Sequence, residues 1–194
     1  WHVDVSLLSS QKALALPPGL SFLALNKKAK LRLETKTCQS YYFDIKAYLA
    51  NQRRGQMPFT PVIGHFMMLH ERLREIRLHG IGFFVSRHSK LAEYFRKGLK
   101  DLPLSFLPNS PSNALTAINC PKDIDAFDFV TRLADDYNCF VAPNGGDLKY
   151  RVFRVSHLGE QNETDIDFLI NALEEILNNY QQTKNHIIME RENY

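Results

Sequence analysis

The chain has 194 residues, 44% of them hydrophobic, which is enough to bury a real core in one large or two small domains. Its formal net charge of +3 is modest for this length, so charge alone indicates neither a nucleic-acid-binding nor a membrane-surface protein. The three cysteines form no CxxC pattern, which argues against a disulfide framework or a zinc site and favours a reducing compartment. No predominantly apolar run approaches the ~18 residues that cross a bilayer, and we expect a cytoplasmic protein.

The N-terminal region has the pattern of α/β material. Apolar residues over 3–8 and over 20–25 predict two short strands, and Pro17-Pro18-Gly19 precedes the second of them. Lys12 therefore lies between two strands, in a run that carries no other charge. The basic stretch 27–32 is interpreted as a solvated helical face, with a nucleic-acid patch as the weaker alternative.

Helical patterns occupy the middle of the chain. Thr60 is a good N-cap and Pro61 suits the first helical position, so the pair predicts a helix start. A second helical pattern covers 83–100, and His88 on its apolar side is interpreted as a packed, hydrogen-bonded histidine rather than as a ligand. The first helix is expected to bury an apolar stripe at helical spacing: Val62, Phe66, Leu69, Leu73 and Ile76.

The composition changes after residue 102. Proline, serine and asparagine are concentrated in residues 103–113, which we interpret as a linker between domains. Thr164 is expected to cap a final helix, and the polar residues 181–194 to form a frayed tail. The segment between linker and tail predicts a small α+β domain, with strands at 114–119, 139–142 and 150–157 and helices at 123–137 and 164–180.

Lys12 is the residue that the sequence singles out for chemistry. Desolvation penalises the ammonium form, so a lysine held in apolar surroundings is expected to present a neutral amine. A neutral amine is a nucleophile toward aldehydes, which is the chemistry of a Schiff base. The alternative is a lysine at a strand end whose side chain simply reaches solvent.

The segment SSQKALALPPGLSFLALNKKAK around this lysine resembles the cofactor-lysine segment of the class V aminotransferases. These are fold-type-I pyridoxal-phosphate enzymes and include alanine–glyoxylate, serine–glyoxylate and 2-aminoethylphosphonate–pyruvate transaminases. The stretches YYFDIKAYL, MPFTPVIG and FRVSHLG continue the resemblance in family order over nearly the whole chain. The cysteine desulfurases, which are similar, carry histidine immediately before the lysine, where this chain has Gln11.

The resemblance implies a role for several residues. Lys12 would form the Schiff base with pyridoxal 5'-phosphate and carry the proton of the reaction as general acid and base. Gln11 matches a position that hydrogen-bonds the cofactor phosphate, and Thr60 matches one that reaches the phosphate held by a neighbouring subunit, which implies a homodimer. Thr60 as a plain helix cap is the structural alternative, and both roles can hold together. Some relatives have a phosphate-binding tyrosine where this chain has Met57.

Arg154 matches the family's arginine for the substrate carboxylate. A guanidinium suits this task because it holds a carboxylate through two parallel hydrogen bonds. Alternation along a strand puts Arg154 and Arg151 on opposite faces, and periodicity alone does not select between them. The family order of arginine, Val-Ser and then glycine selects Arg154, with a structural salt bridge as the alternative.

The fold that the resemblance implies is α/β. Residues 1–102 would be the C-terminal part of the cofactor-binding large domain with connecting helices, and residues 114–180 the small α+β domain. In the family, the phosphate loop, the ring-stacking aromatic and the aspartate that pairs with the pyridine nitrogen all precede the lysine segment, and Asp4 lies too close to the lysine to match that aspartate. The chain thus resembles the C-terminal half of a transaminase, a fragment expected to expose a sheet edge and apolar surface.

Two functions remain open on this resemblance. The first is a pyridoxal-phosphate-dependent transaminase that transfers an amino group from a small amino acid to a 2-oxo acid, pyruvate or glyoxylate. The second is a catalytically incomplete remnant that acts only as a dimerisation or association module. A nucleic-acid-binding module using Lys27–Lys36 and Arg53-Arg54 ranks last, because no aromatic residues interleave with these charges. Neither a metal nor a membrane is expected as a partner.

Overall fold

The computed structural model describes residues 2–192, with side chains described through residue 183. The chain divides into two compact units, Trp1–Leu78 and His79–Tyr194. This division differs from the expected linker at residues 103–113. That proline-rich segment contains a strand, β3 (Ser105–Phe106), which pairs with β4 (Leu115–Asn119) and so belongs to the sheet of the second unit.

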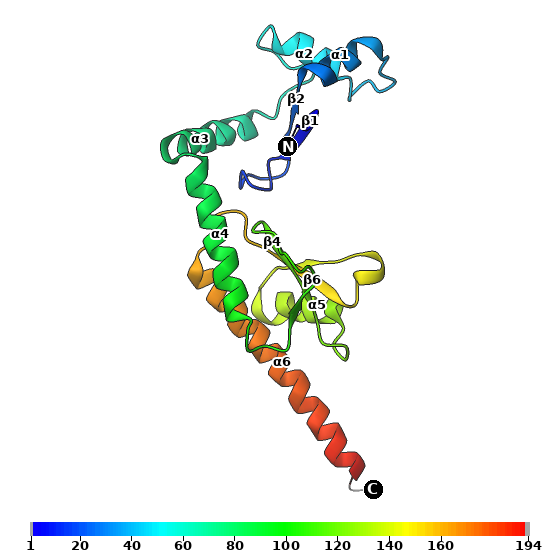
Figure 1. The fold of residues 1–194 in the computed structure, drawn as a ribbon, viewed down its shortest axis with the longest axis vertical. Helices are drawn as coiled ribbons and strands as arrows, with labels where there is room; N and C mark the ends of the chain where they lie inside the picture. Colours follow the sequence, from blue (N-terminus) through cyan, green and yellow to red (C-terminus); the bar gives the residue numbers. More distant parts are fainter. Residues whose placement is uncertain (1, 193–194) are drawn as a thin grey trace. The chain divides into compact units, whose positions relative to one another are not determined.

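The first unit opens with an antiparallel hairpin of β1 (Val5–Ser9) and β2 (Ser21–Leu25), visible in Figure 1. Both predicted strands are confirmed, and Lys12 lies in the loop between them. Every residue of the two strands is exposed or half-buried. Because an isolated two-stranded ribbon is marginally stable at best, this hairpin depends on further contacts for its stability.

Three helices follow in this unit: α1 (Lys27–Thr35), α2 (Ile45–Gln52) and α3 (Ile63–His79). The side chain of Asn26 caps α1 by accepting from the N–H of Ala29, and Asp44 caps α2 by accepting from the N–H of Lys46. The expectation of a solvated basic helix is confirmed in α1, which has no buried residue. The sequence analysis missed α2, for which Asp44 was the available signal.

The predicted helix start at Thr60-Pro61 is wrong. The backbone N–H groups of His65 and Phe66 donate to the carbonyl of Val62, so α3 begins at Ile63 and Thr60 lies before it. Proline fixes only φ, and that value suits extended chain as well as a helix. The apolar stripe is also not buried, since α3 has no buried residue and exposes Ile63, Phe66, Met67 and Leu73, and Val62 just before it is exposed as well.

The second unit is built on an antiparallel sheet in the order β3-β4-β6-β5. Figure 1 shows α5 lying along this sheet and α6 continuing past it. The predicted strands at 114–119 and 150–157 are confirmed as β4 and β6, whereas the strand predicted at 139–142 is reduced to two residues. The remaining elements are α4 (Ile81–Gly98), α5 (Ala126–Tyr137), β5 (Ala142–Pro143), the 3₁₀ turn Gly146–Leu148, β6 (Val152–Ser156) and α6 (Glu163–Glu192).

Helices α4, α5 and α6 pack on one face of this sheet and form its hydrophobic core. On the sheet, this face carries Ile118 of β4 with Phe153 and Val155 of β6. The helices contribute Leu91, Phe95, Phe129, Leu133, Leu173 and Ile176. Phe95, Phe129, Phe153 and Ile176 are fully buried at 0% exposure, so the second unit has a closed core that the first lacks.

The cap predicted for the last helix is also corrected. Asn162 and Asp165 form a reciprocal pair, in which each side chain accepts from the backbone N–H of the other at 2.9 and 3.1 Å. Asn162 is therefore the cap, and Thr164 lies within the first turn. The polar residues from Gln181 continue α6 to Glu192, in place of the frayed tail, and residues 193–194 lie outside the described part.

A histidine is buried in the second unit next to β6. His157 is 0% exposed, its Nε2 shares a hydrogen bond of 2.7 Å with the Thr116 hydroxyl, and its ring lies 5.4 Å from that of Phe95. Its Nδ1 has no hydrogen-bond partner among the described residues. Burial, followed by the positive charges of Arg96 and His88, lowers the pKa of His157 to about 4.

We expect the second unit to lose stability on acidification because of His157. Its pKa falls from 6.5 in the unfolded chain to about 4 in the fold, so its contribution is complete above the unfolded value and is lost as the pH drops between these two values. The loss amounts to at most about 3 kcal/mol, at ~1.36 kcal/mol for each pKa unit. Thermal unfolding followed by circular dichroism from pH 7 to pH 4.5 measures it.

The variant His157→Gln should show a shallower fall of Tm with acid, whereas His70→Gln, at an exposed histidine of α3, should follow the parent chain. Parallel Tm profiles for the parent and His157→Gln would contradict the assignment.

Candidate functional site

The loop between β1 and β2, residues 10–20, is closed at its base by Ser10. This serine is 0% exposed, and its hydroxyl donates to the carbonyl of Pro17 at 2.8 Å and accepts from the N–H of Leu20 at 3.2 Å. Its backbone N–H donates to the Leu20 carbonyl, and its backbone carbonyl accepts from the N–H of Leu16, both at 3.0 Å. One residue thus joins the two ends of the loop.

Lys12 is carried on a turn inside this loop. The N–H of Ala15 donates to the Lys12 carbonyl at 3.0 Å, and Ala15 adopts the left-handed region with φ of 52°. Leu14 on the same turn is buried, whereas Gln11, Lys12 and Ala13 are exposed. The turn therefore directs its leucine inward and its lysine outward.

The exposure of Lys12 corrects one step of the sequence argument. The apolar flanks were expected to surround the amine and favour its neutral form. Leu14 points into the unit instead, and a two-stranded hairpin does not enclose the turn between its own strands. The described residues leave the amine accessible, and desolvation at this position has to come from a bound molecule or from another chain.

A second contact ties the loop to α3. The Nε2–H of His65, in the first turn of α3, donates to the carbonyl of Pro18 at 2.9 Å. The neighbouring Gly19 has φ of 153°, and a Cβ added there would lie 2.6 Å from His65 Nε2. Glycine is required at this position by both the backbone and the close approach of the ring. His65 thereby holds the end of the lysine loop, and this histidine lies five positions after Thr60 in the chain.

Gln11 and Thr60, the two predicted phosphate partners, are both exposed. They lie in the same unit as Lys12, Gln11 directly beside it and Thr60 just before α3. An amide N–H and a hydroxyl can both donate to an anion, so this donor set fits a phosphate. Met57, at the position of the family's tyrosine, is 43% exposed and supplies no hydrogen-bond donor.

Asp4 has a structural task in the hairpin. Its carboxylate accepts a hydrogen bond of 2.8 Å from Asn26 Nδ2 and lies 3.1 Å from Lys28 Nζ. The hydrogen bond from Asn26, followed by that from Lys28, lowers the pKa of Asp4. These contacts agree with the sequence argument that Asp4 is not the family's pyridine-pairing aspartate.

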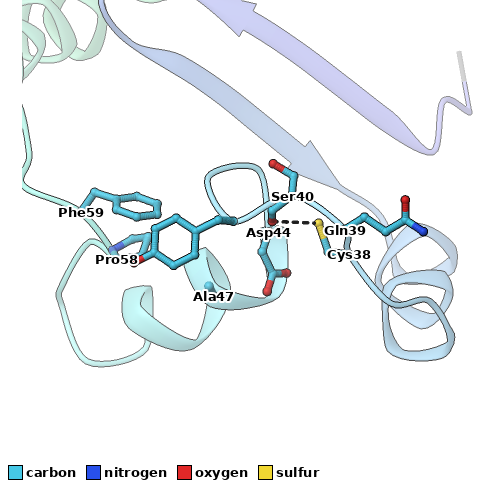
Figure 2. A pocket seen from close by; sticks show the side chains of 8 residues that line it. Cys38, Gln39, Ser40, Asp44, Ala47, Pro58 and Phe59 are labelled. Carbon is cyan, nitrogen blue, oxygen red and sulfur yellow. Dashed lines mark hydrogen bonds between the residues drawn. The ribbon is translucent and has the colours of Figure 1, made fainter.

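A surface concavity of about 390 Å³ lies beside Thr60 and is drawn in Figure 2. The ring of Tyr41 meets the ring of Phe59 edge to face at 5.4 Å, and the Cys38 thiol donates to the Ser40 carbonyl at 3.4 Å. Its only charged group is the carboxylate of Asp44, which repels an anion, so it does not by itself suit a phosphate. The concavity is lined by Cys38, Gln39, Ser40, Tyr41, Asp44, Ala47, Pro58 and Phe59.

Arg154 lies on β6 in the second unit, on the face opposite the helices. Phe153 and Val155 pack in the core, and successive side chains of a strand alternate, so Arg154 projects from the other face. Its partners across the sheet are Ala117 of β4 and Ala142 of β5. The structure therefore separates Arg154 from the helix-covered face and flanks it with small side chains.

The guanidinium of Arg154 is anchored at one nitrogen. Its Nη2 donates to the carbonyl of Pro143 at 2.8 Å, whereas its Nε is buried without a hydrogen-bond partner among the described residues. An unsatisfied donor on an anchored guanidinium is suited to a carboxylate acceptor. The salt bridge considered as the alternative is not made by Arg154 within residues 2–183.

The three cysteines are free thiols, and Cys38 is exposed. Burial, followed by the charge of Asp125, raises the pKa of the Cys120 thiol to about 12. Within the described part of the chain, no group of three or more His, Cys, Asp or Glu side chains is arranged to hold a metal ion. Among the same residues, none of the helices is both long and apolar enough to cross a membrane.

Lys12, Gln11 and Thr60 thus belong to the first unit and Arg154 to the second. Sequence reasoning missed Ser10 and His65, which hold the lysine loop. Ser10 lies inside the segment that carries the resemblance, where its place directly before Gln11 was the available signal, whereas no pattern marks His65. This histidine lies in a helix that exposes most of its apolar residues.

No family model matches the chain. Serine–glyoxylate aminotransferase of Arabidopsis thaliana is 32% identical over 181 residues, which cover 91% of this chain and 45% of that protein. The soluble hydrogenase small subunit of Synechococcus sp. (strain PCC 6716) is 30% identical over 179 residues, 91% of this chain and 46% of that protein. The activities named for these two relatives differ.

The solved structure of alanine–glyoxylate aminotransferase from Nostoc sp. decides between them. It superimposes with a TM-score of 0.83 at 29% identity, covering 91% of this chain and 48% of that chain. The chain belongs to the class V aminotransferase family. Like this Nostoc aminotransferase, it has the α/β fold of the C-terminal part of a fold-type-I enzyme, so the expected fold class is confirmed. The chain spans about half the length of the aminotransferases it matches.

We expect Gly19→Ala to destabilise the first unit of this chain. The added Cβ would lie 2.6 Å from His65 Nε2, at a φ that side chains rarely adopt, and strain of this kind costs about 1–3 kcal/mol. Urea unfolding followed by circular dichroism measures the change. In the control Gly64→Ala, the new Cβ meets nothing within 4 Å, and stability should stay level or rise by up to ~1 kcal/mol. Equal stability of the two variants would contradict the contact.

Proposed function

We propose that the chain carries the lysine, phosphate-binding and carboxylate-binding residues of a pyridoxal-phosphate-dependent transaminase. The proposed reaction transfers an amino group from a small amino acid to a 2-oxo acid, pyruvate or glyoxylate. The observation that carries the proposal is Lys12, which is presented to the outside on a loop fixed at Ser10 and at His65. The names of the Arabidopsis and Nostoc relatives support glyoxylate as the acceptor class.

Pyridoxal phosphate, when bound, supplies an aldehyde that condenses with amines and a ring that takes up electrons. Lys12 Nζ would be the amine that holds it, and the same amine would carry the proton at the substrate Cα. Gln11 donates its amide N–H to the phosphate. Thr60 donates its hydroxyl to the phosphate held by a second copy of the chain. These roles use groups that are exposed in the first unit.

Arg154 binds the α-carboxylate of the donor and of the acceptor. The hydrogen bond from Nη2 to the Pro143 carbonyl supports this role, because it fixes the plane of the guanidinium. A carboxylate bound at a fixed position orients the amino group attached to the same Cα.

The proposal includes a homodimer in the cytoplasm. Exposed apolar side chains on the hairpin and along α3 support association, since apolar surface of this extent is favourable to bury. Free cysteines support a reducing compartment. The side chains available for such an interface include Val5, Leu7, Leu23, Val62, Ile63, Phe66, Met67 and Leu73.

The second candidate is an association module without catalysis. One observation favours it: Lys12 is exposed. In that case the apolar surface of the first unit would bind another chain, and the amine of Lys12 would react like any other exposed lysine. The two candidates differ in whether the cofactor selects Lys12.

Adding pyridoxal phosphate to the purified chain should produce a visible absorption band that depends on Lys12. Borohydride reduction followed by peptide mass spectrometry should place the label on Lys12 in preference to the other lysines, because Gln11 and Thr60 add affinity for the phosphate there. Lys12→Ala should abolish the band, and Lys28→Ala, at an exposed lysine of α1, should retain it. Equal labelling of many lysines would favour the association module.

Replacement of Arg154 by lysine should weaken the binding of the donor carboxylate. A hydrogen bond to a charged group contributes about 1.5–3 kcal/mol, so the alanine concentration that half-bleaches the cofactor band should rise about 10- to 100-fold. Arg151→Lys, at an exposed arginine just before β6, should change it little. An amine without a carboxylate should bleach the parent and Arg154→Lys alike. An equal effect of the two arginines would contradict the role of Arg154.

A further inference from the structure

We propose that Ser10 and His65 are positioning residues that fix the loop of Lys12 in one conformation before the cofactor arrives. The inference rests on the proposed function of Lys12, and it assigns tasks to two residues that touch neither substrate nor cofactor. Ser10 closes the loop from within the hairpin, and His65 holds its Pro-Pro-Gly end from α3.

Ser10 is satisfied as both a donor and an acceptor while it is completely buried. Its hydroxyl joins the Pro17 carbonyl to the Leu20 N–H, two groups that the strand pairing of the hairpin leaves without partners. Alanine at this position would remove this bridge, and because Pro17 is exposed and Leu20 half-buried, water would take over the freed carbonyl and N–H. The loop would then open at Pro17, and the lysine would move with it.

The loop also contains one backbone conformation that does not persist unaided, because Ala15 has φ of 52°. A residue other than glycine in the left-handed region persists when its surroundings hold it there, and such residues concentrate at functional sites. Here the surroundings include the hydrogen bond from Leu16 N–H to the Ser10 carbonyl, which spans the Lys12 turn.

His65 supplies the anchor outside the hairpin. Its bond to Pro18 joins segments 47 positions apart in sequence and fixes the exit of the loop onto the first turn of α3. With both ends fixed, the amine of Lys12 explores less space than on an open loop. Orientation of a catalytic group is worth large factors in rate, and a displacement of about 1 Å can cost about 100-fold. A preorganised loop meets this need without any contact to the amine itself.

Limited proteolysis with trypsin tests the clamp without cofactor, because trypsin cleaves after lysine and the Lys12–Ala13 bond lies inside the loop. Ser10→Ala should raise the rate of cleavage at Lys12 at least tenfold, as followed by intact mass. Ser10→Thr keeps the hydroxyl and should remain closer to the parent. Ser21→Ala removes an exposed serine just beyond the loop and should leave the rate unchanged. His65→Phe should raise it, and His70→Phe, on the same helix, should not.

Trapping with pyridoxal phosphate and borohydride provides the second readout. Ser10→Ala and His65→Phe should lower the labelling of Lys12 at least threefold relative to Lys28 in the same sample. A rise in cleavage at every lysine, Lys28 included, would show a general loss of fold and overturn the positioning role, as would an unchanged rate at Lys12 in both variants. Selective cleavage with no preferred labelling of Lys12 even in the parent would leave the clamp standing and overturn the proposed function.

Discussion

The conformation of the segment that carries Lys12 depends on one buried hydroxyl. Ser10 has to satisfy its own polar atom inside the unit, and it does so by bridging the start and the end of the loop. The hydrogen bonds that allow this hydroxyl to be buried also fix the conformation of the loop. Leu14 is drawn inward by the turn that results, and Lys12 is left outside. The position of the amine follows from the burial of a neighbour rather than from any contact of its own.

The two units differ in how much of their apolar surface they bury. The second unit covers one face of its sheet with α4, α5 and α6 and leaves the face of Arg154 outside this core. The first unit spreads its apolar residues over a hairpin and helices without a comparable core. A surface of this kind is normal for one layer of a larger assembly. The chemistry-bearing lysine therefore lies in the unit that most needs further contacts.

Local patterns in the sequence predicted the elements whose pattern is strong. The strands around Lys12 and, in the second sheet, β4 and β6 followed from apolar runs bounded by turn residues. The starts of α3 and α6 did not, because Thr60 and Thr164 are each good caps in isolation. In α6 the competing Asn162 wins by pairing reciprocally with Asp165, and before α3 the proline fits an extended chain equally well.

The sequence predicted which residues belong to the candidate site, but it did not predict how exposed or buried they are. The choice of Lys12, Gln11, Thr60 and Arg154 came from the resemblance, and of these the register explains the face of Arg154, which alternation alone left open. Burial of Lys12 was inferred from neighbours in sequence, whereas burial is decided by neighbours in space. The role of Ser10 escaped notice for the same reason, although this serine lies directly before Gln11.

Different interactions hold the two ends of the hairpin. At the end away from the lysine, Asp4 meets Lys28 at 3.1 Å through side chains that stand in water, where dissolved ions screen charges over about 10 Å at 0.1 M. At the lysine end the fastening consists of neutral hydrogen bonds shielded from solvent at Ser10. Salt therefore weakens the ion pair at the far end, where the hydrogen bond from Asn26 to Asp4 remains, and it leaves the neutral hydrogen bonds around Lys12 in place.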